Sequence, residues 1–137
     1  MQKLPVNPDL GLLLIRVMVG IVGIAHGGQK LFGLFGGGGF RATADAFGSM
    51  GIPQPTAAAA LAGGAEFFGG LLVALGLFSR IGALFFGATM LTAVFVVHLS
   101  KGFFAGGGGF EYPLTLAVCL IGIIVGGPGK YSITRAV

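Results

Sequence analysis

Long apolar segments alternate with short polar or glycine-rich stretches along the whole chain. Four such segments stand out, at residues 10–32, 57–78, 81–99 and 112–127. A helix needs about 20 predominantly apolar residues to cross a bilayer, and each segment is near that length. All six prolines lie outside these segments or at their ends, where a proline does not interrupt a helix. The pattern predicts an all-α fold, a bundle of four transmembrane helices.

The polar link between the first two segments predicts one more, shorter helix. Apolar and small residues recur there at helical spacing, at Phe40, Thr43, Ala44, Phe47 and Met50. Arg41 and Asp45 fall on the opposite side of the same helix. A short helix with one apolar and one charged face is typical of a segment that lies at the membrane interface or caps the bundle.

Composition supports one membrane domain. Only 9% of the 137 residues are charged and the mean hydropathy is +0.97, so a soluble globule would have too little polar surface to cover itself. The net charge of +4 comes from scattered residues, which suits anionic lipid headgroups and shows no nucleic-acid footprint. The lone Cys119 excludes an internal disulfide or a dithiol redox pair, and we expect it to pack as a small apolar residue.

Charge distribution predicts the topology. With four helices both chain ends lie on one side of the membrane, and that side carries the basic residues Lys3, Arg80, Lys130 and Arg135. The other side carries Lys30, Arg41 and Lys101. The small excess predicts cytoplasmic termini. Arg16 interrupts the first apolar segment, which argues against a cleaved signal peptide.

Glu66 carries the strongest functional signal in the sequence. It is the only charged residue between positions 56 and 79, near the middle of the second apolar segment. A carboxylate at membrane depth is costly unless it is paired or neutralised, so it is by default a candidate site. Arg16 is the only charged residue between positions 10 and 25, and it is the partner that we expect for Glu66.

Small residues form a stripe on each of the first two predicted helices. The first stripe consists of Arg16, Gly20, Gly23, Gly27 and Lys30. The second consists of Ala59, Gly63, Glu66 and Gly70. Stripes of this kind let helices pack closely, so we expect the two to face each other, with Arg16 about 6 Å from Glu66 along the axis. The pair is then either a structural ion pair or part of a ligand site.

A second polar cluster gathers at one predicted face of the membrane. Its members are His26, Gln29, Lys30, His98, Lys101, Glu111 and Tyr112. One interpretation is an ordinary headgroup-level belt, and another is a polar mouth above a cavity between the helices. Two histidines with no cysteine pair or carboxylate cluster are a weak signal for a metal or haem, so we predict no metal site.

Several motifs resemble those of one known family. They are the runs at residues 26–33 (HGGQKLFG), 76–80 (GLFSR), 97–104 (VHLSKGFF), 109–114 (GFEYPL) and 127–132 (GPGKYS), together with the segment around Glu66. In this order they resemble the DoxX family over nearly the whole chain. Members of that family are four-helix membrane proteins of bacteria and archaea, usually labelled oxidoreductases, so the resemblance implies a place in a bacterial cytoplasmic membrane.

The resemblance also implies a function. One branch of the family resembles a subunit of thiosulfate:quinone oxidoreductase, and another is linked with oxidative-stress and thiol-handling partners. The fold is also similar to the core of vitamin K epoxide reductases, but this chain lacks their cysteine pair. We therefore expect a quinone-linked oxidoreductase subunit, in which Glu66 or His26 exchanges protons with a quinone. Lys30 or Arg16 would stabilise a developing quinolate anion.

Two alternatives stay open. One is a non-catalytic membrane scaffold, or a binder of lipids or small ligands, that docks a soluble redox partner. The other is a small transporter, which an imperfect echo between residues 26–40 and 98–110 favours, because transporters are often built from repeats. Four helices would then have to form a homo-oligomer to build a pathway.

Overall fold

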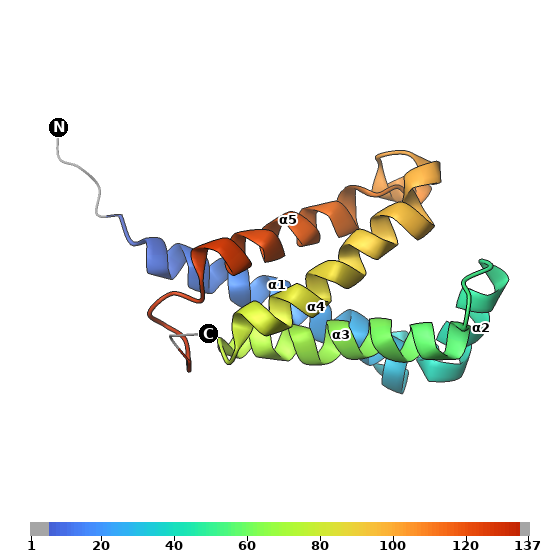
Figure 1. Ribbon diagram of the computed structural model, residues 1–137, viewed down its shortest axis with the longest axis horizontal. Helices are drawn as coiled ribbons and strands as arrows, with labels where there is room; N and C mark the ends of the chain where they lie inside the picture. Colours follow the sequence, from blue (N-terminus) through green and yellow to red (C-terminus); the bar gives the residue numbers. More distant parts are fainter. Residues whose placement is uncertain (1–5, 135–137) are drawn as a thin grey trace.

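The structure is a computed structural model that describes residues 6–134 and contains no strand within that range (Figure 1). Lys3 and Arg135, which entered the charge count, lie outside the described residues. The four apolar helices are α1 (Pro8–Phe32), α3 (Pro55–Leu75), α4 (Ser79–Thr92) and α5 (Glu111–Gly126). Each runs antiparallel to the one before it, so the start of α1 and the end of α5 lie at the same end of the bundle.

Shorter elements connect or extend these helices. They are η1 (Leu34–Gly36), α2 (Gly39–Ser49), the π-helix η2 (Ala93–His98) that continues α4, and the turns η3 (Leu99–Lys101) and η4 (Ala105–Gly107). The predicted all-helical fold is confirmed, as is a short helix between the first two apolar ones. Three stretches are long and apolar enough to cross a membrane, namely Pro8–Phe32, Pro55–Leu75 and Ser79–Lys101, whereas α5 is apolar but has 16 residues.

Local signals explain where the helices begin and end. Asn7 caps α1, because its side chain accepts a hydrogen bond from the amide of Leu10 at 3.1 Å, and Pro8 occupies the first turn, where its missing N–H costs nothing. The second apolar segment was predicted to reach residue 78, but α3 ends at Leu75. Gly76 ends it because it adopts a left-handed φ of 68°, which glycine takes without strain.

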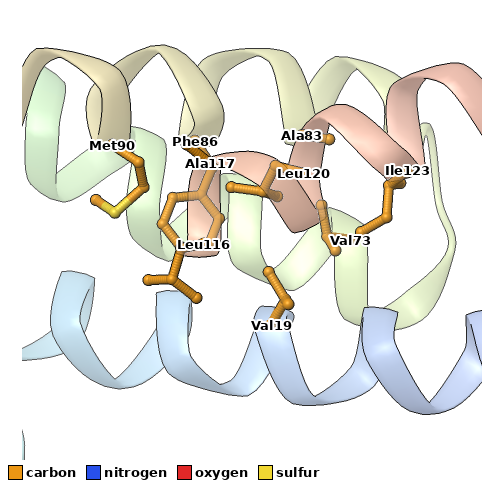
Figure 2. Close-up of a cluster of buried hydrophobic side chains, with 9 residues drawn as sticks. All are labelled: Val19, Val73, Ala83, Phe86, Met90, Leu116, Ala117, Leu120 and Ile123. Carbon is orange, nitrogen blue, oxygen red and sulfur yellow. The ribbon is translucent and has the colours of Figure 1, made fainter. Parts of the chain in front are cut away.

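The apolar core lies where α1, α3, α4 and α5 meet (Figure 2). Its buried side chains are Val19, Val73, Ala83, Phe86, Met90, Leu116, Ala117, Leu120 and Ile123. Cys119 packs against this core as a partly buried residue, as predicted for a small apolar side chain. Many large apolar side chains face outward instead, such as Leu61, which is 74% exposed, and Val125, which is 77% exposed. Such an outer surface suits lipid.

Glycines allow α1 and α3 to approach closely, and the two predicted small-residue stripes do face each other. A Cβ added at Gly20 would lie 2.6 Å from the carbonyl oxygen of Gly70, and one added at Gly23 would lie 2.8 Å from that of Glu66. No side chain larger than a hydrogen fits at these positions without moving backbone. The close approach fixes the height of Glu66 relative to α1.

α3 and α4 touch at one end and separate toward the other. Near their connecting turn Gly69 faces Gly82, and a Cβ added at either would lie 2.8 Å from the carbonyl oxygen of the other. From there α4 rises away from α3 toward η2 (Figure 1). The α4–α5 pair therefore diverges from the α1–α3 pair toward the end that carries α2 and η2.

We predict that Gly20→Ala destabilises the protein by about 1–3 kcal/mol, because the added methyl group overpacks a backbone contact. Its Cβ would lie 2.5 Å from that of Ala74. The thermal midpoint in detergent, which is the temperature at which half of the protein remains monodisperse after heating, should fall. Gly11→Ala, on the same helix with nothing within 4 Å, is the matched control and should not lower it. Equal midpoints for the two variants would contradict the close α1–α3 contact.

Candidate functional site

A cavity of about 730 Å³ lies between the diverging helix pairs. α3 and α4, together with η2, supply most of its walls, and α1 and α5 supply fewer side chains. Residues from α2 and from the link to α3 cover its end, namely Phe47, Met50, Ile52 and Pro53. Few polar side chains reach it: His26, Lys30, Glu66, Thr89, Thr92, His98 and Tyr112. The cavity is therefore an apolar chamber with a small number of polar groups, as ligand sites usually are.

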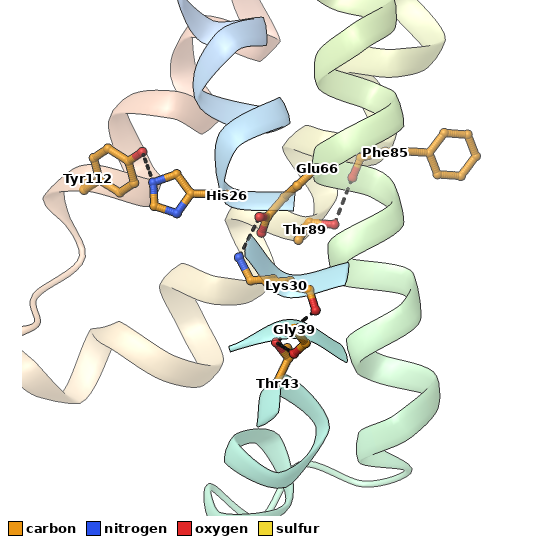
Figure 3. Close-up of polar contacts among 8 residues, drawn as sticks. All are labelled: His26, Lys30, Gly39, Thr43, Glu66, Phe85, Thr89 and Tyr112. Atoms are coloured by element: carbon orange, nitrogen blue, oxygen red, sulfur yellow. Dashed lines mark hydrogen bonds and ion pairs between the residues drawn. The ribbon is translucent and has the colours of Figure 1, made fainter. Parts of the chain in front are cut away.

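Glu66 pairs with Lys30 in this cavity (Figure 3). The Lys30 Nζ lies 2.6 Å from the Glu66 Oε2. Glu66 is only 2% exposed, while the Lys30 side chain is 26% exposed. The carboxylate is thus held inside the protein by one ammonium group that keeps contact with the surroundings. The pair brings a carboxylate and an ammonium group to the same wall.

The predicted Arg16–Glu66 pair is wrong, and helix geometry explains the error. Gly23 lies at the height of Glu66 on α1, and Arg16 and Lys30 are each seven residues from it, about 10 Å along the axis. Side chains on a helix lean toward its N-terminus. In this antiparallel pair Glu66 therefore leans toward Lys30, and Lys30 leans toward Glu66, while Arg16 leans away.

Arg16 instead binds the segment that follows α5. Its guanidinium donates hydrogen bonds to the carbonyl oxygens of Pro128, at 2.6 Å, and Tyr131, at 2.7 Å. The residue is 1% exposed. It also lies against Gly76, just past the end of α3. The C-terminal ends of α3 and α5 carry partial negative charge that favours a cation, so carbonyl groups compensate this buried charge without a carboxylate.

Two histidines line the cavity through different contacts. The His26 Nε2 lies 3.0 Å from the Tyr112 hydroxyl, which joins α1 to the start of α5 (Figure 3). The His98 Nδ1 lies 2.7 Å from the carbonyl oxygen of Gly108. A carbonyl only accepts hydrogen bonds, so Nδ1 of His98 carries the proton and Nε2 is left as an acceptor in the neutral ring.

Three of the predicted ligand-binding residues do not line the cavity. Gln29 donates to the carbonyl oxygen of Phe35 at 3.2 Å, and Glu111 accepts from the amide of Ala105 at 2.8 Å. Lys101 is exposed and lies against Gly108. These side chains stabilise the connections at the η2 end of the bundle. Lys30, His26, His98 and Tyr112 are thus brought together with Glu66, whereas Arg16, Gln29, Lys101 and Glu111 are not.

The threonines of α4 and the apolar cover of the cavity were not predicted from the sequence. Thr89 and Thr92 satisfy their hydroxyls on the carbonyl oxygens of Phe85 and Ala88, which is common inside apolar helices. Such residues carry no motif. Among residues 6–134 no group of three histidine, cysteine or acidic side chains could hold a metal ion.

We predict that the Lys30–Glu66 pair is strongly coupled in stability. Lys30→Met leaves a buried carboxylate unpaired and should cost about 3 kcal/mol, and Glu66→Leu should also destabilise by stranding the ammonium. The double variant Lys30→Met/Glu66→Leu removes both charges and should be more stable than either single variant. Thermal midpoints of the four proteins in detergent would test this. Additive losses would show that the two charges do not interact.

We predict that Arg16→Met frees the segment after α5. The Thr134 amide, which donates to the carbonyl oxygen of Gly76 at 3.0 Å, should exchange its hydrogen faster. Hydrogen–deuterium exchange of peptides that cover residues 128–134 would measure this. Arg41→Met, on the exposed side of α2, is the charge-matched control and should leave the exchange unchanged. Unchanged exchange in the Arg16 variant would mean that other contacts hold this segment.

Comparisons with known proteins show which family the chain belongs to. The family model of DoxX matches residues 11–99. The chain is 38% identical over 108 residues to a protein of Bacillus subtilis (strain 168) named "Putative oxidoreductase CatD", an alignment that covers 79% of this chain and 74% of that relative. No solved structure matches the chain. Together with its apolar helices, these matches establish that the chain is a membrane protein of the DoxX family.

Proposed function

We propose that this protein is the quinone-binding subunit of a membrane oxidoreductase, with the quinone ring in the cavity beside Glu66. One observation carries the proposal. A carboxylate that is 2% exposed, paired with an ammonium group, lies on the wall of an otherwise apolar chamber of about 730 Å³. That volume is within the range of small-molecule sites, about 300–1,000 Å³. The oxidoreductase name of the Bacillus relative supports the same reaction class.

The polar groups of the cavity suit the chemistry of a quinone. Conversion of a quinone into a quinol consumes two electrons and two protons. In this proposal Lys30 donates a hydrogen bond to a ring oxygen and stabilises the negative charge that develops there. Glu66 and His26 each take up a proton from water and pass it to a ring oxygen. The electrons come from a reduced partner protein that docks on the membrane subunit, and oxidative-stress handling is the setting that the family resemblance suggests.

The proposal includes a placement in the membrane. α1, α3, α4 with η2, and α5 would each cross a bacterial cytoplasmic membrane, with α2 at the interface and both termini in the cytoplasm. With its 16 residues α5 is about 24 Å long, a length that a thinned bilayer and the interfacial aromatic side chains of Tyr112 and Tyr131 can accommodate.

Cysteines introduced at Gly51 and Lys130 should be labelled from opposite sides of the membrane, and labelling from one side would refute this arrangement.

A second candidate function is ligand binding without electron transfer. It is favoured by the apolar walls of the cavity and by the exposed rim residues Leu61, Phe85 and Val96, which suit a lipid or another apolar metabolite. In this case the protein would be a scaffold for a soluble redox partner. A solvent extract of the protein purified in mild detergent distinguishes the two functions. Near-stoichiometric quinone supports the first, and phospholipid alone supports the second.

We predict that Glu66→Gln abolishes quinone-coupled electron transfer while the protein stays folded. The amide keeps the shape of the side chain and accepts a hydrogen bond from Lys30, but it cannot deliver a proton. Quinone reduction in membranes supplied with the reducing partner, together with the elution profile in detergent, would measure activity and folding. Glu111→Gln is the matched control, because Glu111 does not line the cavity, and it should keep activity. Full activity of a folded Glu66→Gln protein would refute the proposed function.

A further inference from the structure

We propose that the cavity accepts a neutral ligand with an apolar chain, and that Ala58 and Ala62 on α3 make the room for that chain. The inference rests on the proposed function and specifies its substrate class. The ligand's polar ring lies at Glu66, and its chain runs along the alanine face of α3 and leaves between α3 and α4 toward lipid. Ala62 is then a specificity-determining residue for chain length.

An alanine face on α3 leaves the space open. Ala58, Ala62 and Ala65 lie at i, i+4 and i+7 and line the cavity on the same side as Glu66. From Ala58 to Glu66 the lining extends over about 12 Å, which exceeds the width of a single ring. Because α4 diverges from α3 along this length (Figure 1), the small methyl groups of the alanines do not bridge the gap. Room beyond the ring position is therefore part of the fold.

The ends of the cavity show where a chain can leave. At the inner end Phe86 is 1% exposed, and behind it the Gly69–Gly82 contact closes the space. At the α2 end apolar residues such as Met50 and Ile52 cover it. The rim between α3 and α4 is formed by exposed side chains, with Leu61 at 74% and Phe85 at 60%. An opening bordered by apolar, outward-facing side chains connects the cavity with lipid.

The charges of the site favour a neutral polar group on the ligand. Lys30 and Glu66 neutralise each other at 2.6 Å, so an anionic headgroup would have to displace a buried carboxylate from its ammonium partner. Separation of a buried ion pair is costly. A ring with carbonyl or hydroxyl groups can instead share hydrogen bonds with the pair and leave it intact. The site therefore favours a neutral ligand over fatty acids and anionic phospholipids.

The experiment compares one set of variants with three probes. Native mass spectrometry of the full-length protein from nanodiscs would give affinities for a quinone with a single isoprenyl unit, for decylubiquinone and for dodecanol. Ala62→Phe should weaken decylubiquinone and dodecanol at least about tenfold, the equivalent of roughly two lost methylene contacts, and leave the short-chain quinone within about threefold. Ala65→Phe, next to Glu66, should weaken both quinones. Ala60→Phe, on the exposed side of α3 and outside the cavity lining, should change none of the three.

The outcomes separate this inference from the proposed function. If both quinones bind the wild-type protein and Ala62→Phe weakens them equally or not at all, the chain path is refuted and the quinone site stands. If dodecanol binds in an Ala62-dependent way but neither quinone binds, the chain path stands and the quinone function is refuted. If none of the probes binds the wild-type protein, both are refuted.

Discussion

The glycine-mediated contact between α1 and α3 is the constraint on which the rest of the structure depends. Because Gly20 and Gly23 have no side chains, the two helices lie backbone to backbone, and their relative height is fixed. That height decides which of the two cations on α1 meets Glu66. It also leaves the alanine side of α3, next to Glu66, to face the space under α4. The ion pair and the cavity are therefore products of the same helix contact.

The two cations of α1 are compensated by different means, which separates a structural contact from a candidate functional one. Arg16 is held by backbone carbonyl groups of the segment that follows α5, an arrangement that fixes the chain and leaves little for a ligand to use. Lys30 is held by a titratable carboxylate that borders a cavity. The carbonyl partners of Arg16 cannot gain or lose a proton, whereas a carboxylate partner such as that of Lys30 can. The first cation stabilises the bundle, and the second suits chemistry.

The sequence predicted the helical fold, the short helix before α3 and the facing glycine stripes, because each depends on residues that repeat with the period of a helix. It identified Glu66 because an isolated acidic residue stands out in an apolar segment. It did not identify the partner of Glu66. Arg16 and Lys30 are equally far along α1 from Gly23, which is level with Glu66, and only the direction of their side chains distinguishes them. The carbonyl partners of Arg16 could not be predicted from the sequence, since every residue has a carbonyl group. The sequence offered a cavity between the helices as one interpretation, but the position and apolar walls of the cavity follow from the angle between the helices rather than from any motif.

The long reach of Arg16 has a consequence for biosynthesis. The residue enters the membrane with the first helix, but its acceptor at Pro128 lies 112 residues later in the chain. An arginine near the centre of a lone membrane helix costs about 2.5–3.5 kcal/mol on insertion scales. During translation this charge stays uncompensated until almost the whole protein has been made. Contacts between residues so far apart in sequence form late. A chain that ends before Pro128 therefore lacks the carbonyl groups that compensate Arg16.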